Sequence, residues 1–172
     1  MSLPVRTPKC IVRTFQLEDA PSIARNGNNR TIWRNLRDRF PHPYTEDDAV
    51  GYIRFILAKS PYHSLAIEVD GEAVGGLSLR QGQDIERLTA EIGYWIGEPY
   101  WGRGIMTDAV GLLTDYAFSA LALERVFAVP FTSNVASCRV LEKVGYVCEG
   151  LMRRSAIKDG QIQDQYLYAK LR

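Results

Sequence analysis

Residues 100–107, with the sequence YWGRGIMT, are the part of the chain whose residue types most directly suggest a chemical role. Gly102 and Gly104 flank an arginine, and they precede a segment whose apolar spacing predicts a long helix. A glycine-rich turn entering a helix exposes unpaired N–H groups at the positive end of the helix dipole, which favours a phosphate. We therefore expect this turn to bind a nucleotide-like anion.

Two other phosphate-binding motifs fit the sequence less well. A dinucleotide-binding motif needs a third glycine where Thr107 stands, and its ribose-binding acid follows the next strand, whereas Glu124 precedes that strand. A P-loop needs a glycine followed by Lys and then Ser or Thr, and the sequence contains none. The sequence therefore argues against nicotinamide-dinucleotide and triphosphate chemistry.

Composition predicts a globular protein of ordinary size. The 172 residues are 46% hydrophobic and 24% charged, with a net charge of +1, which excludes a disordered chain and a strongly basic nucleic-acid binder. We expect one domain over residues 1–172, with residues 1–9 as a flexible tail. The three cysteines lack metal-ligand spacing, and no apolar run reaches the length of a membrane span. These features predict a cytoplasmic protein without a metal, a membrane partner or a nucleic-acid partner.

Alternating strand-like and helix-like segments must position the glycine turn. The sequence predicts strands over residues 10–15, 64–69, 73–80, 89–97, 125–130, 146–153 and 164–171. It predicts helices over residues 18–36, from 45 to near Ser60, from the glycine turn to about Leu121, and from Ser133 or Asn134 to Gly145. Asp70-Gly71 predicts a hairpin, and residues 158–160 a second turn. The expected fold is α/β (α+β), with one mixed, mostly antiparallel sheet of about six to seven strands flanked by helices.

Four segments of this sequence together resemble a known family. AEIGYWIGEPYWGRGIMTDAV and TSNVASCRVLEKVGYVCEG resemble the acyl-CoA-binding core of the GNAT superfamily of N-acetyltransferases. FPHPYTEDDAVGYI and KDGQIQDQYLYAKL resemble the RimJ/RimL-like branch, which is similar to the ribosomal-protein alanine N-acetyltransferases. The resemblance covers nearly the whole chain, and it implies the GNAT fold, an N-acetyltransferase activity and acetyl-CoA as cofactor.

The resemblance also implies how the cofactor is held. In the family, backbone amides of the glycine turn wrap the pyrophosphate, and the end of the preceding strand offers main-chain groups to the pantetheine arm. The superfamily pattern places Gln or Arg at Trp101 and Gly or Ala at Met106, so here the resemblance supports backbone contacts more than side-chain contacts. The implied cofactor-binding residues are Tyr94, Trp95, Ile96, Gly97, Trp101, Gly102, Arg103, Gly104, Ile105, Met106, Thr107, Asn134 and Ser137.

Amide formation needs an acceptor for the amine proton and help for the leaving thiolate. No Cys-His or Ser-His-Asp set is evident, so we expect direct attack by the amine. Glu91 is the predicted general base, because several superfamily members carry a glutamate on this strand; a cross-strand pair is the alternative. Ser137 matches a serine that holds or protonates the thiolate in some members, although a serine here can also belong to a helix cap. We expect Cys138 to be a packing residue.

The predicted acceptor-binding residues lie between the first two helices. In this branch the segment FPHPY borders the acceptor, so Trp33, Phe40, His42 and Tyr44 are candidate contacts; an exposed histidine and aromatic anchors for the loop are the alternatives. The expected acceptor is a protein N-terminal amine. A small-molecule amine (amino sugar, polyamine or antibiotic) and a non-catalytic acyl-CoA sensor stay open, as does a homodimer.

Overall fold

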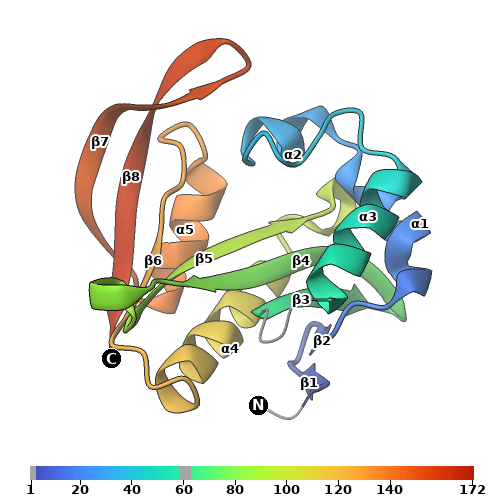
Figure 1. Ribbon diagram of the computed structural model, residues 1–172, viewed down its shortest axis with the longest axis horizontal. Helices are drawn as coiled ribbons and strands as arrows, with labels where there is room; N and C mark the ends of the chain where they lie inside the picture. The colour runs from blue at the N-terminus through green and yellow to red at the C-terminus, as the bar shows by residue number, and fades with distance from the viewer. Residues whose placement is uncertain (1–2, 59–62) are drawn as a thin grey trace.

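The computed structural model describes residues 3–58 and 63–172, and its centre is one mixed β-sheet (Figure 1). The strand order is β1-β2-β3-β4-β5-β6-β8-β7; β5 and β6 are parallel, and the other neighbouring pairs are antiparallel. The strands are β1 (Val5–Arg6), β2 (Ile11–Arg13), β3 (His63–Val69), β4 (Glu72–Gln81), β5 (Thr89–Ile96), β6 (Arg125–Ala128), β7 (Val147–Lys158) and β8 (Gln161–Leu171). The predicted fold class is confirmed. The eighth strand is β1, which lies within residues 1–9, the segment expected as a flexible tail, and pairs with β2.

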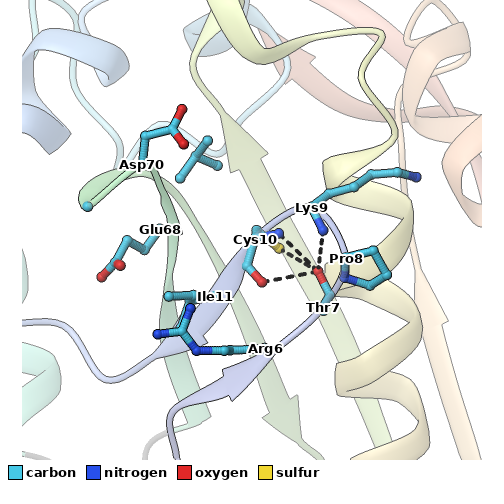
Figure 2. A pocket seen from close by; sticks show the side chains of 10 residues that line it. Arg6, Thr7, Pro8, Lys9, Cys10, Ile11, Glu68 and Asp70 are labelled. Atoms are coloured by element: carbon cyan, nitrogen blue, oxygen red, sulfur yellow. Dashed lines mark hydrogen bonds between the residues drawn. The ribbon is translucent and has the colours of Figure 1, made fainter.

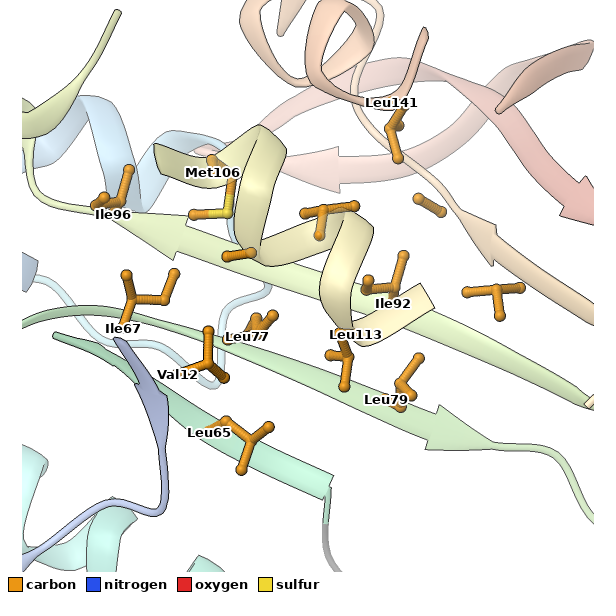
Figure 3. Packing of buried hydrophobic residues seen from close by; sticks show 14 of the residues in the cluster. Val12, Leu65, Ile67, Leu77, Leu79, Ile92, Ile96, Met106, Leu113 and Leu141 are labelled. Atoms are coloured by element: carbon orange, nitrogen blue, oxygen red, sulfur yellow. The ribbon is translucent and has the colours of Figure 1, made fainter. Parts of the chain in front are cut away.

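Helices cover both faces of the sheet (Figure 1). They are α1 (Ala20–Gly27), α2 (Arg30–Arg34), α3 (Glu46–Leu57), α4 (Ile105–Ser119) and α5 (Val135–Val144). One buried cluster joins α4 and α5 to the sheet, and Figure 3 shows Leu113 of α4 beside Ile92 of β5 and Met106 near Ile96. A second cluster joins α1 and α3 to the sheet around Phe15 and Ile53. The two clusters fix β5 between a helix layer on each side.

The helix predicted over residues 18–36 is broken into α1 and α2. Asn28 leaves the helical conformation, and Asn29 then caps α2 by accepting hydrogen bonds from the backbone of its first turn. Gly27 lies against aromatic rings, since a Cβ built there would stand 3.0 Å from Phe40 and 3.2 Å from Tyr44. This packing brings residues 35–44 back over α1, which periodicity alone does not reveal.

Local signals set most of the other boundaries. Asp70 and Gly71 both have positive φ, as the predicted hairpin between β3 and β4 requires. Gly145 ends α5 with φ 90°, and Asn134 rather than Ser133 is its N-cap. The helix expected to run to near Ser60 ends at Leu57, and Ser60 itself lies outside the described residues. None of the described helices is both long and apolar enough to cross a bilayer.

Candidate active site

The parallel strands β5 and β6 separate partway along β5. Their register runs only from Thr89 and Arg125 to Glu91 and Phe127, after which β5 continues to Ile96 without β6 beside it. The other edge of β5 stays paired with β4 throughout. The far half of β5 therefore has an open edge within the sheet, and a short 3-10 helix (Glu98–Tyr100) connects its end to the glycine turn (Figure 1).

The register shows which main-chain groups occupy this open edge. The N–H of Gly97 donates to the carbonyl of Val74 at 2.9 Å, so Gly97 directs its N–H and C=O groups toward β4. Every second residue back along β5 does the same, and the residues between them direct their N–H and C=O groups away from β4. Tyr94 and Ile96 therefore present theirs to the open edge. The carbonyl of Ile96 accepts the indole N–H of Trp101 at 2.8 Å. The N–H and C=O of Tyr94 remain positioned for an extended ligand.

The turn before α4 has the conformation that its glycines allow. Gly102 and Gly104 have φ of 72° and 75°, and Gly104 is the N-cap of α4 without a side chain of its own. Trp101 and Arg103 are exposed, whereas Ile105 is buried in the core and anchors the helix start. The predicted turn thus joins an exposed loop to a fixed helix N-terminus, as an anion site needs.

Lys9 also reaches this turn and was missed by sequence reasoning. Its ammonium group contacts Asp108 at 3.2 Å, and it lies 2.7 Å from the position that a Cβ on Gly104 would occupy. Lys9 comes from the β1–β2 turn, so no local pattern connects it with α4. The segment expected to be a tail therefore places a cation over the predicted phosphate site.

Asn134 and Ser137 lie at the start of α5, opposite the open edge. The side-chain oxygen of Asn134 accepts the backbone N–H of Ser137 at 3.2 Å, so its capping role is present. The hydroxyl of Ser137 lies 2.9 Å from the hydroxyl of Tyr94. Burial raises the pKa of Tyr94, so its phenol keeps its proton well above neutral pH and can donate a hydrogen bond. Cys138 is buried as expected, and burial raises the pKa of its thiol.

Glu91 lies on the opposite face of β5, in an ion-pair cluster. One carboxylate oxygen accepts from Arg37 at 2.5 Å, and the other pairs with Arg80, its cross-strand neighbour on β4. The cross-strand pairing is therefore present, and the predicted role as general base stays a prediction. Arg37 follows α2, and its contact with Glu91 was not foreseen because 54 residues separate the two.

The predicted acceptor aromatics divide into two groups. Phe40 stacks on Tyr44 with ring centroids 4.2 Å apart and meets Trp95 edge-on at 5.5 Å, while Tyr44 is buried. These three rings anchor the loop that contains Phe40 and Tyr44 to the sheet. The Trp95 side chain therefore packs against this loop and does not face α5. Trp33 and His42 lie farther out, with ring centroids 5.8 Å apart, and His42 is exposed.

The β7–β8 hairpin contacts the segment that carries these residues. The Lys158 side chain is only 4% exposed, pairs with Asp38 at 2.7 Å and lies 3.9 Å above the ring of Trp33. Next to it Asp159 pairs with Arg30 at 2.9 Å. The tip of a hairpin near the C-terminus thus holds the α2 segment in place, as Figure 1 shows by its curl toward α2.

Two surface hollows lie away from the residues predicted by sequence. One, of about 380 Å³, is formed by the turns joining β1 to β2 and β3 to β4, and Figure 2 shows Thr7 bonded to Lys9 and Cys10 on one side of it. The other, of about 450 Å³, lies between the end of α1 and residues 98–100. Within the described residues, no three His, Cys, Asp or Glu side chains are grouped to hold a metal ion.

Comparison with protein families gives a match along most of the chain. The model described as "Acetyltransferase (GNAT) domain" matches residues 9–147. The chain belongs to this GNAT acetyltransferase family. The predicted family is thereby confirmed, and the open edge of β5 and the glycine turn both lie within the matched part.

Curated relatives of this GNAT domain carry N-acetyltransferase names. YjcK of Bacillus subtilis, named a probable N-acetyltransferase, is 40% identical over 102 residues, or 59% of this chain and 56% of YjcK. YdaF of the same organism, named provisionally as a ribosomal N-acetyltransferase, is 37% identical over 103 residues, or 60% of this chain and 56% of YdaF. The spermidine N(1)-acetyltransferase of Escherichia coli is 26% identical over 155 residues, or 89% of this chain and 81% of that enzyme. The chain thus aligns with little more than half the length of YjcK and YdaF.

Solved structures confirm the fold of this GNAT domain. A GNAT-family acetyltransferase from Bacillus anthracis superimposes with a TM-score of 0.86 at 20% identity, covering 98% of both chains. RimJ of Mycobacterium smegmatis, solved in complex with CoA-disulfide, has a TM-score of 0.85 at 27% identity, covering 98% of this chain and 85% of RimJ. The presence of a CoA species in RimJ agrees with the predicted cofactor.

Proposed function

We propose that this GNAT domain transfers the acetyl group of acetyl-CoA to the N-terminal amine of a protein or peptide. The observation that carries the proposal is the open edge of β5 beside the glycine turn of α4. The edge supplies the main-chain groups of Tyr94, and the turn supplies helix N-terminal N–H groups and Lys9. An extended ligand with a phosphate at one end fits this arrangement.

The residues at the open edge fit the demands of acetyl transfer. Bound acetyl-CoA supplies an acetyl thioester. The Tyr94–Ser137 hydroxyl pair lies beside the open edge on the α5 side and can donate a proton to the departing thiolate sulfur. On the other face, Glu91 is the candidate to accept the proton that the amine loses when its nitrogen bonds to the acetyl carbon. Each oxygen of the Glu91 carboxylate contacts one arginine, so either oxygen keeps a lone pair that can accept this proton.

The choice of a peptide rather than a polyamine rests on charge. Glu91 is the one carboxylate that β5 itself carries, and two arginines already neutralise it. A polycation would meet those arginines without a free carboxylate to bind it. The relative named for spermidine supports the alternative, whereas the name of YdaF supports a ribosomal-protein acceptor.

Release of free CoA thiol from acetyl-CoA tests the proposal. Peptides with varied N-termini form one pool, and common small amines, including spermidine, form the other. We expect thiol release with the peptides, and mass spectrometry should find the acetyl group on their N-terminal nitrogen. Release with small amines alone would overturn the peptide proposal. Silence in both pools with acetyl-CoA bound would favour a sensor over an enzyme.

A further inference from the structure

The face of β5 that carries Glu91 has an uncovered position beside the open edge. Gly93 is exposed, and a Cβ built there would meet only the hydroxyl oxygen of Ser78, at 3.7 Å. Trp95 lies on the same face in one direction along the strand and Glu91 in the other. On the opposite face, Ile92 and Ile96 are buried in the cluster beneath α4. An acceptor therefore reaches the open edge from the Gly93 side.

The charges around Gly93 are mainly positive. The guanidinium groups of Arg37 and Arg80 share the single carboxylate of Glu91, and their side chains remain 58% and 59% exposed. Asp38, next to Arg37 in the chain, already pairs with Lys158, and Asp159 at the tip of the β7–β8 hairpin pairs with Arg30. Each guanidinium has five N–H donors, and Glu91 contacts one terminal nitrogen of each. The pair therefore keeps donors and net charge for an incoming anion.

On the basis of the proposed function, we propose that the preferred acceptor peptide has an acidic side chain directly after its N-terminal residue. That carboxylate binds Arg37 and Arg80 while the amine lies over Gly93. Arginine forms its strongest hydrogen bonds with carboxylates, and the excess positive charge speeds their encounter. The spare N–H donors of the two guanidinium groups bind this carboxylate, so Glu91 keeps its own contacts with both arginines.

Matched peptides that share one N-terminal residue test this preference. Positions two and three of the peptide carry Asp-Glu, Asn-Gln or Lys-Lys. The three peptides have the same number of residues, and the side chains of Asp-Glu and Asn-Gln have nearly the same shape. We expect kcat/KM at low salt to be about tenfold higher for Asp-Glu than for Asn-Gln, and lowest for Lys-Lys. Added KCl should reduce these ratios, because ions screen exposed charges.

Variants of the two arginines connect the preference with the site. Arg37→Gln and Arg80→Gln should each bring the Asp-Glu to Asn-Gln ratio toward one. Arg37→Lys should keep a preference, because the charge remains. The matched control is Arg54→Gln on the exposed side of α3, where the ratio should be unchanged.

Failure of this inference differs from failure of the proposed function. Equal kcat/KM for all three peptides, or a preference for Lys-Lys, would overturn the acidic preference while leaving N-terminal acetylation established. A ratio that survives both glutamine variants would also overturn it. Thiol release with none of the peptides would instead overturn the proposed function itself.

Discussion

The hydroxyl groups of Tyr94 and Ser137 lie 2.9 Å apart and connect β5 to the first turn of α5, across the region where β5 and β6 have separated. Neither strand pairing nor helix capping requires this contact. It places two hydroxyl groups on the α5 side of β5, where Tyr94 also turns its main-chain groups to the open edge. Its geometry is suited to proton donation during loss of a thiolate.

Removal of either hydroxyl should therefore slow the reaction more than it weakens cofactor binding. We expect Tyr94→Phe and Ser137→Ala each to lower kcat by about tenfold to a hundredfold, with little change in the KM for acetyl-CoA. Because the two groups act as a pair, the double variant should be hardly slower than either single variant. Steady-state kinetics of the three variants checks this, and strictly additive losses would mean that the hydroxyls act independently.

Gly104→Ala should raise the KM for acetyl-CoA several-fold. Alanine at φ 75° is strained, and its Cβ would collide with the Lys9 ammonium group. Gly71→Ala is the matched control, since Gly71 also has positive φ and a Cβ there would meet nothing within 4 Å. If both variants raise KM equally, general strain explains the effect and the turn loses its assigned role.

The ammonium group of Lys9 should contribute to cofactor affinity. We expect Lys9→Gln to weaken CoA binding by about threefold to tenfold, and Asp108→Asn, which frees Lys9 from its ion pair, to leave binding unchanged or to strengthen it. Calorimetric titration with CoA measures both variants. Equal weakening by the two would show that the ion pair matters only for the shape of the turn.

Glu91→Gln should lower kcat by about a hundredfold, most strongly at low pH, where the amine is hardest to deprotonate. Glu149→Gln is a matched control, because Glu149 also pairs with an arginine, Arg125, but lies on β7. A pH-rate profile of both variants separates loss of a base from loss of an ion pair. Unchanged kcat for Glu91→Gln across the profile would assign Glu91 to structure alone.

The Tyr146 side chain should make the free energy of unfolding depend on pH in the alkaline range. Burial raises the pKa of Tyr146 from 10.0 to about 12, although its hydrogen bond with Thr114 acts in the other direction. The folded state thus holds the phenol proton more tightly than the unfolded state. This stabilisation is complete below pH 10 and declines as pH rises toward 12.

Urea unfolding of the original chain and of Tyr146→Phe measures this dependence. The free energy of unfolding of the original chain should fall more steeply between pH 10 and 12 than that of the variant. Below pH 10 the difference between the two should be constant, because neither state loses the phenol proton there. Parallel curves above pH 10 would contradict the buried, protonated phenol.

Features determined by neighbouring residues were predictable from the sequence. The positive φ at Asp70 and Gly71, and the left-handed end of α5 at Gly145, follow from local turn chemistry. The glycine turn before α4 was predicted in the same way, because its glycines and its helix are contiguous, and its anion-binding role stays a prediction. The resemblance then supplied the family, which adjacent residues alone do not identify.

Features that depend on distant residues were not predictable. Lys9 meets Asp108, Arg37 meets Glu91 and Lys158 meets Asp38 across long stretches of chain, and no periodicity records such contacts. For the same reason, the sequence left Glu91 open between a base and a cross-strand partner. The break between α1 and α2 was missed although Asn28 and Asn29, which end one helix and cap the next, are adjacent in the sequence; the packing of Phe40 against Gly27 beside it joins residues distant in the chain.

The strand order β6-β8-β7 has a consequence for the folding of the chain during its synthesis on the ribosome. β8 follows both of its neighbours in the chain, so β6 and β7 cannot form their ladders with it until residues 161–171 have left the exit tunnel. Until then β6 and β7 keep exposed edges that can pair with other chains. A stop codon placed directly before residue 161 should thus yield an aggregating polypeptide.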